Sequence, residues 1–149
     1  MLIANFQTGS ISHFITLSVI AILTAGLAVV TKRTTVDANR ISLRKLIGWG
    51  SLVAGLLNTA YWLSPSRFDL SQSLPLHLCN LANFIGAAAV LKEARLFKGL
   101  LYFWSGLCLW AFLTPTIDKG VEDPGFWIFG LYHSFILFTL VVILRGDQF

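Results

Sequence analysis

The chain has 149 residues, of which 56% are hydrophobic and only 12% are charged, and its mean hydropathy is +0.74. Soluble domains carry about 25% charged residues, and a domain this small cannot cover several helices that are apolar on every face. The composition therefore favours a membrane protein over a soluble one. The net charge of +4 lies in short clusters between apolar runs, a pattern typical of topology signals, so we expect no nucleic-acid partner.

Five apolar runs follow one another along the chain, each close to the ~20 residues that a helix needs to cross a bilayer. None of the runs contains Asp, Glu, Lys or Arg. Pro115 and the pair Pro124-Gly125 mark the connection between the last two runs. The sequence predicts one all-α domain over residues 1–149, a bundle of about five transmembrane helices at residues 11–30, 46–63, 74–91, 100–117 and 126–144.

The basic residues predict the orientation of this bundle. Two of them, Arg67 and Lys119, fall on one side of the predicted membrane, and the other nine fall on the opposite side. By the positive-inside rule, the N-terminus lies outside and the C-terminus lies in the cytoplasm. The first run has no basic residue before it, so we expect an anchor and not a cleaved signal peptide. The nine cytoplasmic basic residues are Lys32, Arg33, Arg40, Arg44, Lys45, Lys92, Arg95, Lys98 and Arg145.

Polar side chains within the predicted spans lie mainly in the outer half of the bundle. Hydrocarbon offers them no hydrogen-bond partner, so they indicate either a polar pocket that opens outward or a set of interhelical hydrogen bonds. A lone Asn in a span more often serves the second purpose. The cytoplasmic half instead has a run of small residues at 86–89, which suits close helix packing with another subunit. The candidate pocket residues are His77, Asn80, Asn58, Tyr61, Asn83 and Thr114.

Cys79 and His133 form the pair on which a chemical function would depend. An imidazole can take the proton of a thiol, and the thiolate can then attack an ester. The third and fifth spans are predicted to be parallel, which brings the two residues to similar depth. Cys79 and Cys108 lie at estimated depths several ångströms apart, so we expect no disulfide. The sequence contains no CxxC-type spacing, and we expect no metal or other cofactor.

The run Leu74-Pro75-Leu76-His77-Leu78-Cys79-Asn80 resembles a hallmark segment of the YwaF family of integral membrane proteins. Residues 102–107 and 113–115 are similar to that family's fourth helix, and His133 matches a histidine of its fifth helix, so the resemblance covers residues 58–145. It extends to eukaryotic membrane lipid acyltransferases, and it implies that Cys79 is a nucleophile and His133 its general base. Cys108 lies outside the matched positions.

The same resemblance has implications for length and location. Members of that family usually have about seven spans, so this chain resembles a member truncated after its fifth helix. The expected location is the bacterial inner membrane, as a multi-pass protein.

Two functions from different classes follow. The first is a Cys/His-dependent phospholipid acyltransferase or ester hydrolase, with His77 and Asn80 as orienting donors in an outward-facing pocket. The second is a non-catalytic accessory or structural subunit of a larger membrane complex, which the short chain favours. The expected partners are membrane lipids and other membrane protein subunits or a second copy of the chain.

Overall fold

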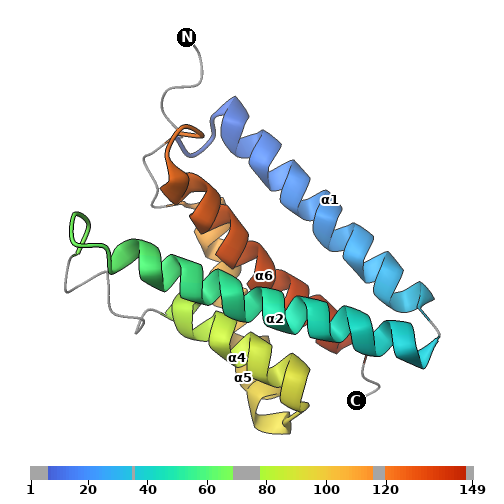
Figure 1. Cartoon of the computed structure of the whole chain (residues 1–149). Helices are drawn as coiled ribbons and strands as arrows, with labels where there is room; N and C mark the ends of the chain where they lie inside the picture. The colour runs from blue at the N-terminus through green and yellow to red at the C-terminus, as the bar shows by residue number, and fades with distance from the viewer. Residues whose placement is uncertain (1–6, 35, 69–77, 116–119, 147–149) are drawn as a thin grey trace.

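The computed structural model describes residues 7–34, 36–68, 78–115 and 120–146, and within these ranges it is helical with no strands. The predicted all-α bundle is confirmed. Helices α1, α5 and α6 are long and apolar enough to cross a membrane, whereas α4 is apolar but shorter. The described helices are α1 (Ile11–Arg33), α2 (Asp37–Trp62), α4 (Leu78–Lys92), α5 (Arg95–Leu113) and α6 (Pro124–Gly146) (Figure 1).

Two helices begin earlier than the apolar runs predict. Helix α2 starts at Asp37 where Leu46 was expected, and α5 starts at Arg95 where Leu100 was expected. A helix satisfies its own backbone hydrogen bonds, so it continues past its apolar part while long basic side chains extend toward water. The connections that the predicted spans left between these helices are therefore shorter, because α1 ends at Arg33, α2 begins at Asp37, α4 ends at Lys92 and α5 begins at Arg95, and most of the basic residues lie on helix ends.

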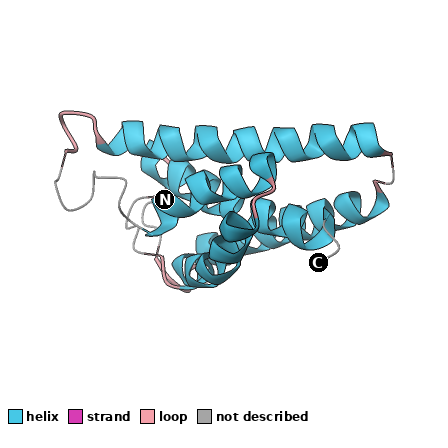
Figure 2. Ribbon diagram, turned by 90° about the horizontal axis from the view of Figure 1, so that it is seen from below, coloured by secondary structure: helices cyan, strands magenta, loops and turns pink. Residues whose placement is uncertain are grey.

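Helix α6 lies at the centre of the bundle and packs against α1, α2, α4 and α5 (Figure 1). Helix α1 is the most peripheral, and of its side chains only His13, Ile20 and Thr31 are buried. In the view of Figure 2, α2 runs along one side of the molecule and the other helices gather beneath it. The remaining surface of α1 is apolar and exposed in the chain alone, as expected for a helix that faces lipid.

Small residues on α4 allow it to approach α6 closely. A Cβ atom on Gly86 would lie 2.7 Å from Thr139 Oγ1, so the two helices touch at a point that only glycine permits. Ala87 and Ala89 are also buried. The close helix packing predicted for this small-residue run therefore occurs within the chain itself, and its use by another subunit stays a prediction.

Contacts fix the directions of the helices. Asn83 and Gly86 of α4 meet Tyr132 and Thr139 of α6 in the same order, so α4 and α6 are parallel, as predicted for the third and fifth spans. Helix α2 runs against α4, because its end meets the beginning of α4 and its middle meets the end of α4. The basic ends of all five helices consequently share one end of the bundle.

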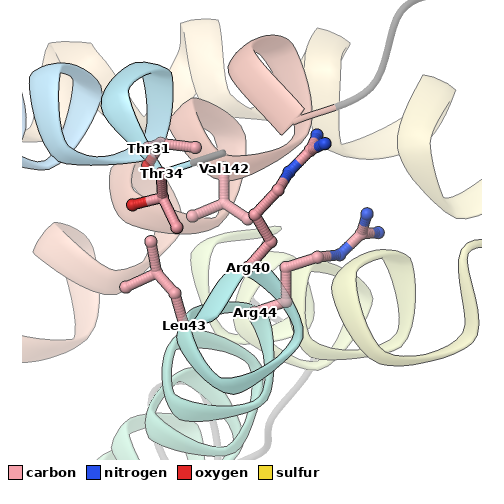
Figure 3. Close-up of a pocket in the computed structure, with 6 residues that line it drawn as sticks. All are labelled: Thr31, Thr34, Arg40, Leu43, Arg44 and Val142. Atoms are coloured by element: carbon pink, nitrogen blue, oxygen red, sulfur yellow. The ribbon is translucent and has the colours of Figure 1, made fainter. Parts of the chain in front are cut away.

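A small open pocket lies at this basic end. It is lined by Thr31 and Thr34 of α1 and the loop after it, Arg40, Leu43 and Arg44 of α2, and Val142 of α6 (Figure 3). Figure 3 shows both guanidinium groups extending to the same side, away from the threonines. Arg44 also pairs with Glu93 at 3.0 Å, which ties α2 to the turn between α4 and α5.

Candidate functional site

The polar side chains predicted to line a pocket form buried interhelical hydrogen bonds at the end of the bundle opposite the basic residues. Asn58 of α2 donates from Nδ2 to Asn80 Oδ1 of α4 at 2.6 Å. Asn83 accepts from the Ser51 hydroxyl at 3.0 Å and donates to the Tyr132 carbonyl at 2.9 Å, which joins α2, α4 and α6. Of the two interpretations of these asparagines, the structure shows the hydrogen-bond network.

The burial of these polar residues removes one reason for expecting a partner subunit. Asn58, Asn80 and Asn83 are at most 4% exposed and His133 is 1% exposed. A partner subunit was expected partly because these groups would otherwise face lipid, where an unsatisfied polar group costs several kcal/mol. The chain itself buries them, so this reason does not hold, and association with another subunit stays a prediction.

His133 is surrounded by aromatic rings, and one of its two ring nitrogens makes a hydrogen bond within the described residues. Its ring centroid lies 4.0 Å from that of Tyr132, 4.2 Å from Phe129 and 5.5 Å from Phe112. Its Nδ1 lies 2.9 Å from the carbonyl oxygen of Phe129. A carbonyl only accepts, so Nδ1 carries the proton and Nε2 carries the lone pair. Nε2 makes no hydrogen bond within the described part of the chain, and this tautomer suits a general base.

His13 has the opposite character, because both of its ring nitrogens are used. Nδ1 accepts from the backbone N–H of Gly9 at 2.9 Å, and Nε2 donates to the carbonyl of Phe112 at 2.7 Å. These bonds attach the beginning of α1 to the end of α5. His13 is therefore a structural histidine, and Phe112 is held between it and the ring of His133.

The two cysteines meet where α4 faces α5. Cys108 Sγ donates to Cys79 Sγ at 3.5 Å, and neither residue forms a disulfide. Cys79 is half-buried, whereas Cys108 is only 1% exposed. The separation expected from their depths is wrong, because α4 packs against α5 and the two sulfur atoms lie in contact. Tyr132 and Cys79 both pack against the core cluster that includes Cys108.

The structure brings some of the predicted site residues together and separates others. Tyr132 stacks on His133 and packs against the same core cluster as Cys79, but the His133 ring makes no hydrogen bond to the thiol within the described residues. Thr114 is exposed, and its hydroxyl donates to the Trp110 carbonyl of its own helix. His77 lies outside the described residues.

Tyr61 belongs to a separate cluster at the end of α2 opposite its basic residues. Its hydroxyl donates to Asp123 Oδ1 at 3.1 Å, and the Arg67 guanidinium lies 4.6 Å from its ring centroid. The same carboxylate oxygen accepts from the backbone N–H of Gly125 at 2.6 Å, so Asp123 caps the first turn of α6. Tyr61 therefore positions α6 and does not face the cysteines.

Sequence reasoning missed three neighbours of the candidate pair, namely Cys108, Tyr132 and Phe112. Cys108 and Phe112 are four residues apart and so share one face of α5. That spacing was a usable signal, but it identifies a face of α5 without naming the helix that the face meets. Tyr132 precedes His133 directly, and its proximity to the thiols depends on tertiary packing.

No curated protein and no solved structure matches the chain. The membrane character expected from composition agrees with the three helices, among the described residues, that are long and apolar enough to span a bilayer. The resemblance to the YwaF family is wrong, because a family model for a different family matches residues 8–149. The expectation of a truncated YwaF member loses its basis with that resemblance. The match covers nearly the whole chain, and the protein belongs to the TMEM164 family.

Proposed function

We propose that this membrane protein is a thiol-dependent lipid acyltransferase, in which Cys79 accepts the acyl group and His133 is the general base. The observation that carries the proposal is the tautomer of His133. Its Nδ1 is held by the Phe129 carbonyl, and its Nε2 lone pair has no partner among the described residues, at a buried position on the helix parallel to that of Cys79. Nucleophilic catalysis by a thiol requires a base of this kind, and Cys79 on the parallel helix α4 is the half-buried thiol that it would serve.

The proposed reaction uses these two groups in turn. His133 Nε2 takes the thiol proton, and the Cys79 sulfur attacks the carbonyl carbon of a phospholipid ester. The ester C–O bond breaks, the lysophospholipid leaves with the proton from His133, and the acyl chain remains on Cys79 as a thioester. A lipid hydroxyl then attacks the thioester and gives its proton to Nε2, and the sulfur departs and is reprotonated. If water attacks in place of the lipid hydroxyl, the same site hydrolyses esters.

The lack of a hydrogen bond between His133 and Cys79 among the described residues is compatible with the reaction. Catalytic hydrogen bonds are often long before substrate binds and shorten in the reactive complex. Residues Cys79 and His133 lie on parallel helices that Asn83 joins directly. Cys79 lies one turn before Asn83, about 6 Å along the helix axis, so the reaction requires the thiol and the imidazole to approach each other when substrate binds.

The test uses the purified chain in phosphatidylcholine nanodiscs that contain a phospholipid with a fluorescent acyl chain and a lysophospholipid acceptor. Wild type should move the label to the acceptor, and a labelled protein thioester should be released by neutral hydroxylamine. Cys79→Ala and His133→Ala should both lose transfer, and the double variant should be little worse than either single one, because nucleophile and base act as a unit.

The matched control is Ser134→Ala. Ser134 is the buried neighbour of His133, and its hydroxyl donates to the Gly130 carbonyl of its own helix, so the variant should transfer at the wild-type rate. Full transfer by Cys79→Ala would refute the thiol mechanism. A folded wild type with neither transfer nor hydrolysis on any acyl donor tested would favour the non-catalytic subunit.

A further inference from the structure

The contact between Cys79 and Cys108 has no role in acyl transfer as described above. Two thiols 3.5 Å apart on adjacent helices need to move by only about 1.5 Å to reach the S–S bond length of about 2.05 Å. They are the two cysteines of the chain, and both are reduced in the structure. We propose that Cys79 and Cys108 are a site of reversible oxidation, in which a hydroperoxide converts the pair to an intrachain disulfide.

The burial of the two residues assigns their roles. Cys79 is half-buried and therefore within reach of a small oxidant, whereas Cys108 is 1% exposed and is shielded. Cys79 is also the acceptor of the hydrogen bond, and the sulfur that accepts a hydrogen bond is the one that better supports the negative charge of a thiolate. Cys79 is the sulfur that is oxidised first, and Cys108 is the sulfur that resolves it.

The chemistry balances in two steps. In the first, the Cys79 sulfur attacks the peroxide, the O–O bond breaks, an S–O bond forms, and the thiol proton goes to the departing alkoxide or hydroxide. In the second, the Cys108 sulfur attacks the sulfenic acid on Cys79, the S–S bond forms, and the S–O bond breaks. The Cys108 proton and the departing hydroxide form water. The two thiols are oxidised by two electrons in total, and the hydroperoxide is reduced to an alcohol or to water.

The pairing protects the accessible cysteine from permanent damage. A lone sulfenic acid can be oxidised further to a sulfinic acid, which is normally irreversible, whereas a disulfide is restored by thiol exchange. Where Cys79 is also the acyl-accepting nucleophile, which rests on the proposed function, the disulfide removes that nucleophile. Acyl transfer is then switched off by peroxide and restored by reduction.

The first experiment counts thiols and needs no enzymatic activity. The purified full chain in nanodiscs is treated with hydrogen peroxide, denatured, and reacted with a maleimide polymer that shifts each thiol on a gel. Wild type should lose both labels together, stay monomeric on a non-reducing gel, and lose two hydrogens in intact mass with no added oxygen. Dithiothreitol should restore both labels.

The variants Cys108→Ser and Cys79→Ser provide the comparison. At the same peroxide dose, Cys108→Ser should gain oxygen on Cys79, and Cys79→Ser should keep its shielded thiol. The proposal is overturned if wild type gains oxygen, keeps both thiols, or forms a disulfide-linked dimer. Because wild type supplies the decisive measurement, misfolding of a variant does not affect the conclusion.

A second experiment separates this proposal from the proposed function. Acyl transfer by the peroxide-treated wild type should fall to the level of Cys79→Ala and return after reduction. Formation of the disulfide in a chain whose reduced form has no transfer activity would refute the acyltransferase and leave the oxidation site standing. An oxidised chain that still transfers acyl groups would show that Cys79 is not the nucleophile.

Discussion

At the scale of single residues, the buried polar groups of this protein differ in which hydrogen-bond partners they find. His13 and His133 are both buried, yet one uses both ring nitrogens and the other uses one within the described residues. Composition and depth do not separate these two histidines. The difference arises because His13 lies at a helix start beside the N–H of Gly9, whereas His133 lies within a helix and bonds a carbonyl one turn earlier.

Asn83 is the residue whose loss should affect stability most directly. Replacing it with Ala removes two interhelical side-chain hydrogen bonds, those with the Ser51 hydroxyl and the Tyr132 carbonyl, which should cost about 1–3 kcal/mol of the free energy of unfolding. The Ser51 hydroxyl keeps its bond to the backbone carbonyl of residue 83. Titration of the detergent-solubilised protein with SDS measures this change. Thr59→Ala is the control, because its hydroxyl bonds the Gly55 carbonyl of its own helix, and equal losses for both variants would contradict the bridging role.

At the scale of helices, apolar runs define where a span exists but not where its helix begins. The early starts of α2 and α5 place Arg40, Arg44, Arg95 and Lys98 on helices and not in loops. Hydropathy identifies only the part of a helix that crosses the apolar core of the membrane. The backbone hydrogen bonds that stabilise the helix continue beyond the edge of that core. The apolar runs therefore predicted that each described helix exists but underestimated the lengths of α2 and α5.

The contact between α4 and α6 at Gly86 gives a prediction at this scale. A Cβ at this position would lie 2.7 Å from Thr139 Oγ1 and 3.2 Å from Thr139 Cβ, so Gly86→Ala should push the helices apart and destabilise the protein by about 1–3 kcal/mol. Shortening the facing side chain with Thr139→Ala should recover part of this loss. SDS titration again provides the measurement.

Gly106→Ala is the matched control for that experiment. Gly106 lies in α5, where a Cβ atom would meet no neighbouring atom of the described residues within 4 Å. Alanine is also the better helix former, so the substitution should be neutral or slightly stabilising. A Gly86→Ala variant as stable as Gly106→Ala would show that α4 and α6 do not pack this closely.

At the scale of the whole molecule, the basic ends of the helices share one end of the bundle, and the buried histidines and asparagines of the described chain gather toward the other, namely His13, Asn58, Asn80, Asn83 and His133. Alternating helix directions produce this separation, which agrees with the charge asymmetry of the sequence. The orientation in the membrane remains a prediction from the positive-inside rule.

Single cysteines test that orientation in intact cells. With both native cysteines replaced by Ser, Ser66→Cys should react with an impermeant thiol reagent, because residue 66 follows the outer end of α2. Ser42→Cys should react only after the cells are opened, because residue 42 lies in the basic first turns of α2. Both positions are exposed in the structure. Labelling of Ser42→Cys alone in intact cells would invert the proposed topology.

The sequence by itself determined the membrane class, the all-α fold, the order of the helices and the shared direction of α4 and α6. These follow from local properties, since apolar length and the placement of charge act on each segment separately. It also identified Asn58, Asn80, Asn83 and His133 as interior polar groups, because hydrocarbon makes any such residue conspicuous.

Only the tertiary structure decided which of these groups meet. That Asn83 joins three helices, that Phe112 lies between His13 and His133, and that Cys79 faces Cys108 depend on the rotation and crossing of helices about one another. Those quantities are set by side-chain packing between segments distant in the chain, as where Gly86 meets Thr139. Depth along a helix can be counted from the sequence, whereas the direction in which a side chain faces a neighbouring helix cannot.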